Sequence, residues 1–171
     1  RRVVVRPEVD GVVIEQNEKL VVGGWIAKGE LLVRVDPRDY AAALVTAKAE
    51  LAQADLGIQL ERGKQLVARR EWELLREDGG MDKANSDLAL RLPHMQQKKA
   101  ALAAAMSRVE KAMADLERTT ILAPFDGQVL SESVEEGQWV SSQTVVAELV
   151  AVDRFRVLVA LPVDRLSRVR I

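Results

Sequence analysis

The 171-residue sequence contains no cysteine and a single histidine, His94. The absence of cysteine excludes a disulfide framework and a thiolate metal site within these residues, and it leaves the cellular compartment open. One histidine and no thiol leave few candidates for a catalytic nucleophile and its base. No Ser/His/Asp set, carboxylate pair or phosphate-binding loop stands out. We therefore expect no enzymatic activity, no cofactor and no metal site, with His94 as a surface residue.

An excess of one charge and long apolar runs are missing as well. Lysine and arginine number 25 and aspartate and glutamate 26, so the net charge of −1 offers no basic excess for nucleic acid. No apolar run approaches the roughly 18–20 residues of a membrane span. The chain starts at Arg1 without a methionine or a signal peptide. We expect it to be a piece of a longer protein whose targeting elements lie elsewhere.

Two stretches that start at Gly23 and Gly137 repeat one pattern. "GGWIAKGELL" and "GQWVSSQTVV" each place a tryptophan two residues after the first glycine, followed by an apolar residue. A proline and an Asp-Gly pair precede the β-rich run in both copies, which is turn chemistry leading into a strand. Residues spaced by three extend the match: Leu20, Gly23, Ile26, Gly29 and Leu32 in one copy, and Val134, Gly137, Val140, Gln143 and Val146 in the other.

The repeat predicts that residues 3–36 and 119–152 are two halves of one β-sandwich. One half alone has too little apolar surface for a stable sheet, whereas two halves together can enclose a core. Ile26 and Val140 occupy equivalent positions in the two copies. We expect both side chains to be buried in related places.

Residues 37–118 carry a helical pattern instead. Asp78-Gly79-Gly80 is the strong breaker within it, so the pattern predicts two antiparallel helices in a coiled-coil hairpin with its tip at about 77–81. Met95, Met106 and Met113 are expected to fill the seam between the helices rather than to bind a metal. The seam residues recur at steps of three and four: Tyr40, Leu44, Ala47, Leu51, Ala54, Ile58, Glu61, Gln65, Ala68, Trp72 and Leu75 on the first helix, and Leu88, Leu92, Met95, Lys99, Leu102, Met106, Val109, Met113 and Leu116 on the second.

The middle of this arm is predicted to be its weakest part. Antiparallel pairing brings Glu61 within a turn of Lys99, so polar residues meet on the seam. Each helical glycine nearby costs about 1 kcal/mol relative to alanine, and Pro93 removes a helical hydrogen bond unless the regular helix only begins there. A partly exposed Glu61–Lys99 contact, worth about 0–1 kcal/mol, does not offset these losses. We expect a bend between residues 57–65 and 93–101.

The order of half-motif, hairpin and half-motif resembles the periplasmic adaptor family, also called membrane fusion proteins. The resemblance implies an α+β fold, in which a lipoyl- or biotinyl-like β-sandwich is split by a long antiparallel coiled-coil hairpin. Residues 153–171, with their alternating apolar positions, then form the start of a β-barrel domain. The segments that carry the resemblance are "RPEVDGVVIE", "GGWIAKGELLVRVDPRDY" and "LERTTILAPFDGQVLSESVEEGQWVSSQT".

The resemblance also implies a mechanical function. Such an adaptor joins an inner-membrane resistance-nodulation-division (RND) transporter to an outer-membrane TolC-like channel in a tripartite efflux pump. It is expected in the periplasm, anchored to the inner membrane by an N-terminal segment outside this sequence, and to self-associate into a ring of three or six copies. The adaptors of type I secretion systems are the alternative within the family.

The family contacts its channel through a pattern at the hairpin tip of Arg, three residues, Leu, six residues and Ser. Arg70 and Leu74 match the first two positions, and Met81 stands where the serine is expected. The resemblance therefore implies a channel contact at Arg70, Leu74 and Met81.

Trp25 and Trp139 are candidates for a second contact. Each lies next to an expected core residue, and adjacent side chains of a strand point to opposite faces. Both rings should therefore be at least partly exposed. They either cover a small sandwich or form a patch through which adaptors pack side by side.

A biotin or lipoyl carrier domain is the alternative from another functional class. "MDKANSD" contains the Asp-Lys-Ala tripeptide that surrounds the modified lysine of lipoyl carriers, here with Lys83. A carrier lysine stands on the tight turn between the two half-motifs, where this chain has its long hairpin instead. Mass spectrometry separates the two functions, because a carrier bears a lysine adduct.

Overall fold

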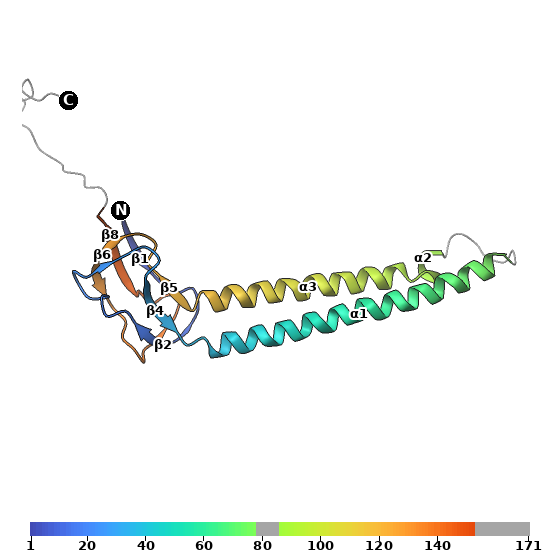
Figure 1. Ribbon diagram of the computed structural model, residues 1–171, viewed down its shortest axis with the longest axis horizontal. Helices are drawn as coiled ribbons and strands as arrows, with labels where there is room; N and C mark the ends of the chain where they lie inside the picture. Colours follow the sequence, from blue (N-terminus) through green and yellow to red (C-terminus); the bar gives the residue numbers. More distant parts are fainter. Residues whose placement is uncertain (78–85, 153–171) are drawn as a thin grey trace, which may run out of the picture.

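The computed structural model describes residues 1–77 and 86–152. A small β body lies at one end of the molecule, and two long helices extend side by side from it (Figure 1). The strands are β1 (Arg2–Val5), β2 (Gly11–Gln16), β3 (Trp25–Ile26), β4 (Leu31–Val35), β5 (Thr120–Leu122), β6 (Gly127–Glu132), β7 (Trp139–Val140) and β8 (Ala147–Ala151).

The strands form two four-stranded sheets, with orders β1-β8-β6-β3 and β5-β4-β2-β7. Exchanging each strand of the first half for its counterpart in the second half turns one order into the other. Each sheet therefore takes two strands from each half, and all the pairs are antiparallel. The prediction of one sandwich built from two copies of a half-motif is confirmed, and the copies are interleaved.

The repeated Asp-Gly pairs link the two halves through related hydrogen bonds. The Asp10 carboxylate accepts a bond from the Ser142 backbone N–H at 3.2 Å. In the related place, the Asp126 carboxylate accepts one from the Lys28 backbone N–H at 2.7 Å. Each aspartate thus holds a turn of the opposite half, which gives a structural reason for the repeat of this residue.

The core lies between the two sheets. Ile26 and Val140 are completely buried in it, as predicted from the repeat. Fully buried side chains come from both halves: Val13, Leu20, Ile26, Leu32, Val33 and Val35 from the first, and Val129, Val140, Val146 and Leu149 from the second.

The helices of the arm are α1 (Arg38–Glu77), α2 (Ser86–Ala89) and α3 (Leu92–Glu117). At 1.5 Å per residue, the 40 residues of α1 extend about 60 Å. Two contacts fasten the base of the arm to the loop before β2: the Tyr40 hydroxyl donates to the Asp10 carbonyl at 2.6 Å, and Arg118 pairs with Glu8 at 2.7 Å. Among the described residues, no helix is both long and apolar enough to cross a membrane.

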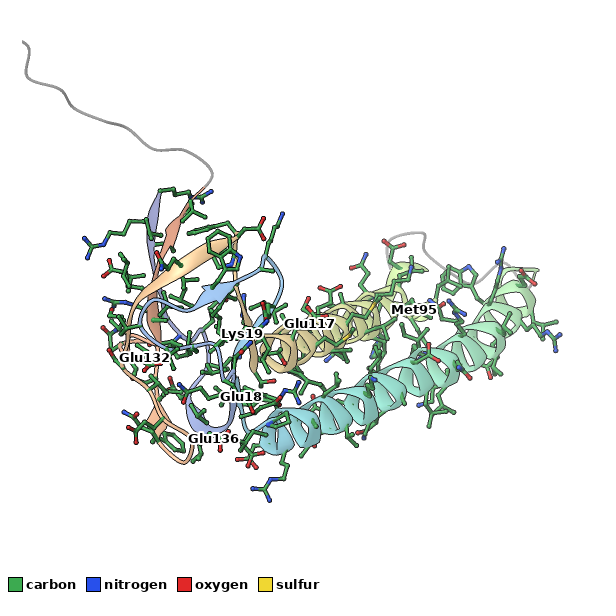
Figure 2. All side chains as sticks on the ribbon, turned by 60° about the vertical axis from the view of Figure 1, so that its left-hand side comes forward. Glu18, Lys19, Met95, Glu117, Glu132 and Glu136 are labelled. Atoms are coloured by element: carbon green, nitrogen blue, oxygen red, sulfur yellow. The ribbon has the colours of Figure 1, made fainter. Side chains whose placement is uncertain are left out.

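The seam residues predicted on α1 from Tyr40 to Trp72 are all buried or partly buried, and those up to Glu61 face α3. The side chain of Leu75 lies outside the described residues. On α3, the prediction was right for Met95, Leu102, Val109 and Leu116. Met95 lies near the end of α3 farthest from the sheets (Figure 2).

The seam positions assigned to Met106 and Met113 were wrong, because these side chains are 50% and 45% exposed. Their neighbours Ala105 and Ala112 take the seam positions instead. Alanines on both helices let the two backbones approach closely, so a methionine at this position would be too large. Leu88, Leu92 and Lys99, also predicted on the seam, are exposed as well.

Two glycine substitutions are expected to change stability in opposite directions. A Cβ atom on Gly127 would lie 2.7 Å from the Val150 carbonyl oxygen, whereas one on Gly63 would meet nothing within 4 Å. Gly127→Ala should lower the free energy of unfolding by about 1–3 kcal/mol through overpacking. Gly63→Ala, in the exposed part of a helix, should raise it by about 0.5–1 kcal/mol. Urea denaturation measures both, and equal effects would contradict the packing at Gly127.

Glu30 is expected to make the sandwich sensitive to acid. Its pKa falls from 4.5 to about 2, first because the Lys19 ammonium donates to its carboxylate, then because the Ala27 backbone N–H and the Asn17 amide do so. A lowered folded-state pKa stabilises the protein above pH 4.5, and this stabilisation is lost as the pH falls toward 2. Glu30→Gln should therefore be less stable than the parent at pH 6, with a difference that shrinks by pH 3. A constant difference in denaturation midpoint would contradict this.

Candidate functional site

The residues that match the channel-contact pattern lie in the upper part of α1, which is the part farthest from the sheets. Arg70 and Leu74 are both exposed, and they lie one turn apart on the same side of the helix. Among the described residues, neither is covered by the return helix. Met81 and Lys83 lie outside the described residues.

Arg70 and Leu74 belong to a larger apolar face on the side of α1 that points away from α3. Leu60, Val67 and Leu74 follow one another at intervals of seven residues, and Leu56 and Leu66 lie beside them. All five side chains are more than half exposed. The outer face of a two-helix hairpin in water is normally polar, so this face is suited to a partner. The sequence did not indicate this face, because one apolar stripe per helix is sufficient for a hairpin.

The outer face of α3 is made of small residues at a comparable distance from the sheets. Ala100, Ala103, Ala104 and Ser107 are all exposed on it. The register follows from two contacts: Glu50 pairs with Arg108 at 2.8 Å, and a Cβ atom on Gly57 would lie 3.7 Å from the Lys98 side chain. Leu56 on the outer face of α1 therefore lies level with Ala100 on the outer face of α3, whereas Leu60, Val67 and Leu74 lie farther from the sheets.

A buried ion pair lies on the seam between the two helices. The Glu61 side chain is 4% exposed, and Arg91 holds it with two bonds, Nε to Oε1 at 2.6 Å and Nη2 to Oε2 at 3.0 Å. The Arg91 guanidinium is the main reason that the pKa of Glu61 lies below its usual value. The expected Glu61–Lys99 contact was wrong, because Lys99 points to solvent.

The return helix is interrupted at Arg91, whose φ of 56° lies in the left-handed region. α2 ends at Ala89 and α3 begins at Leu92, with Pro93 in its first turn, where its missing N–H leaves no bond unmade. A non-glycine residue in this region costs about 1–3 kcal/mol. The break therefore lies just before the predicted 93–101 stretch, and α1 continues through residues 57–65 uninterrupted. Weaker protection of the backbone amides against hydrogen exchange in the middle of the arm stays a prediction.

Two hollows of about 550 Å³ each flank this break. Arg62, Leu66 and Leu92 line one of them, and Leu60 and Val67 line the other. Both combine apolar side chains with cationic ones. They extend the apolar face of α1 to both sides of the seam.

Trp25 and Trp139 lie on β3 and β7, each at the edge of a different sheet. The two side chains are 54% and 66% exposed, as the repeat predicts. Since β3 and β7 are equivalent strands of the two halves, the two rings occupy related positions. They are separate from the arm, and any contact through them is separate from the tip.

The comparison with protein families assigns this architecture. The family model for the barrel-sandwich hybrid domain of RND membrane fusion proteins matches residues 1–152. The chain belongs to this family. Its α+β fold, with a lipoyl-like sandwich split by a helical hairpin, is therefore the fold of the family, as the resemblance implied.

Two curated relatives of the adaptor have similar sequences. The multidrug efflux pump subunit AcrA of Escherichia coli K12 is 32% identical over 143 residues, which are 84% of this chain and 34% of AcrA. The efflux pump periplasmic linker BepD of Brucella suis biovar 1 is 32% identical over 157 residues, which are 89% of this chain and 36% of BepD. The chain thus spans about a third of the length of these relatives.

Two solved structures are similar to the adaptor. A putative efflux transporter from Bacteroides eggerthii has a TM-score of 0.68 at 27% identity, over 90% of this chain and 40% of that one. A MacA–MexA chimeric protein, which contains the α-hairpin domain of Pseudomonas aeruginosa MexA, has a TM-score of 0.60 at 28% identity, over 87% and 47%.

Proposed function

We propose that the protein is the periplasmic adaptor of a tripartite multidrug efflux pump, joining an inner-membrane RND transporter to an outer-membrane TolC-like channel. The observation that supports the proposal is the split sandwich with its long arm, in a chain that belongs to the RND membrane fusion protein family. The names of the relatives AcrA and BepD support the multidrug pump and the periplasmic location. Anchoring at the inner membrane by a segment before residue 1 is part of the same proposal.

The function is mechanical and needs no chemistry. An arm of about 60 Å is a spacer that extends the adaptor away from its β body. Arg70 and Leu74 would contact the channel at its far end, with Met81 completing the contact. Leu74 provides an exposed apolar group and Arg70 a charge that fixes orientation, a combination typical of interface residues.

Self-association into a ring of three or six copies is the second part of the proposal. The apolar face of α1, with Leu56 and Leu60, is complementary in size to the small residues of α3, such as Ala103. A contact between two different faces is heterologous, and repeated rotation of such a contact closes a ring. Trp25 and Trp139 would add contacts between neighbouring β bodies.

Reversal of charge at the tip tests the channel contact. Arg70→Glu should abolish efflux in cells that lack the wild-type adaptor, because the side chain is exposed and its charge is needed only by a partner. The growth-inhibitory concentration of an exported compound should fall to the level of the null strain. Lys48→Glu, the same charge change at an exposed position near the base of α1, is the matched control and should keep efflux. Normal efflux with a folded Arg70→Glu adaptor would exclude the contact.

Disulfide trapping tests the ring contact, since the chain has no cysteine of its own. With Leu56→Cys and Ala103→Cys in the same chain, oxidation should produce a ladder of cross-linked oligomers on non-reducing gels. Each single variant should stay monomeric on the gel, because its partner residue is not a cysteine. Dimers from a single variant would instead indicate contact between identical faces and contradict the heterologous ring.

A further inference from the structure

Glu61 is the one charged residue buried in the described part of the chain, and it lies on a seam that is otherwise largely apolar or small. A buried ion pair is often less stabilising than a well-packed apolar pair, because both charges leave water. Such a pair restricts the relative position of the two helices, because a guanidinium binds both carboxylate oxygens only in one relative placement. The Glu61–Arg91 pair has this two-bonded geometry.

Gln65, the next seam residue of α1 toward the tip, binds the same part of the return segment. Its Nε2 donates to the Leu90 carbonyl at 3.1 Å and reaches the Arg91 carbonyl at 3.5 Å. The left-handed backbone at Arg91 interrupts the helix here, so the side chain of Gln65 can reach these carbonyls.

A shifted return helix cannot reproduce both contacts. A displacement by one heptad would bring Lys98 to Glu61, and a single ammonium replaces the forked guanidinium. Gln65 would then face carbonyls that the regular helix α3 already uses. His94 and Lys64 are the other cationic or titratable groups whose charge acts on the Glu61 carboxylate, and neither bonds to it among the described contacts.

We propose that Glu61, Gln65 and Arg91 form a positioning site that fixes where the return helix begins and so holds α2 in one placement against the end of α1. Arg70 lies nine residues beyond Glu61, about 13 Å along the helix. Beyond Arg91, the described return segment consists of Leu90 and the four residues of α2, and α2 contacts α1. The placement of the upper arm therefore depends on this lock. Its consequence for channel docking rests on the proposed function, but the lock itself does not.

Pulsed electron–electron resonance on spin-labelled protein tests the lock. One label pair, Val67→Cys with Asp87→Cys, spans the two segments beyond the lock, and both parent residues are exposed. A second pair, Lys48→Cys with Glu110→Cys, lies in the lower arm and is the internal control. In the parent the upper pair should give one narrow distance distribution.

Glu61→Leu separates positioning from stability. The Arg91 side chain is 31% exposed and can turn to water when the carboxylate is removed, so the thermal midpoint should change little. The upper distance distribution should nevertheless broaden at least twofold while the lower one stays narrow. Glu61→Gln keeps the shape of the side chain but removes its charge. This variant should also broaden the upper distance distribution. A narrow upper distribution in both variants would overturn the proposal.

A double variant that exchanges the two charged residues tests whether the ion pair itself is required. Glu61→Arg combined with Arg91→Glu should restore the narrow distribution, whereas Arg91→Gly, which keeps the left-handed backbone without the charge, should not. A narrow distribution in Arg91→Gly would show that the turn alone positions the segments beyond it. A distribution that stays broad in the exchanged pair would show that a charge pair at these two positions is not sufficient. Either result would overturn the role of the ion pair. These distances do not depend on efflux, so a failure of the channel-contact test leaves the lock intact.

Discussion

The pairing of β4 with β5 is the constraint on which the rest of the structure depends. Arg34 and Thr120 are register partners in this antiparallel pair, so the chain leaves the sandwich and returns to it at almost the same place. The residues between them must therefore form a segment that starts and ends at the same edge of the sandwich. Two antiparallel helices satisfy this with most of their backbone hydrogen bonds made within each helix, and their length sets how far the segment extends from the sandwich.

The sandwich can hold such an arm because its two halves are interleaved. Each sheet contains strands from both halves, and Asp10 and Asp126 each bond to a turn of the other half. Neither half can leave without exposing the whole core. The base of the arm is tied to the same body through Tyr40 and Arg118, so a load on the arm passes into both sheets.

Along the arm, the seam and the outer faces divide the residues by size. Alanines such as Ala105 bring the helices together, which leaves larger apolar residues such as Met106 on the outside. A hairpin built in this way is held together by its seam and still presents apolar surface to solvent. That combination is consistent with a subunit that completes its packing within an assembly, and it differs from an isolated coiled coil with polar outer faces.

The split sandwich, the exposed tryptophans and the seam of α1 could be predicted from the sequence, because they follow from a repeat and from a regular spacing of neighbouring residues. The choice between Ala105 and Met106 could not, since both fit a heptad step and the distance between the helices selects the smaller residue. The partner of Glu61 also depends on the tertiary structure. The left-handed turn at Arg91 shifts the return segment, and no spacing in the sequence reveals a turn that Glu61 and Gln65 stabilise from another helix.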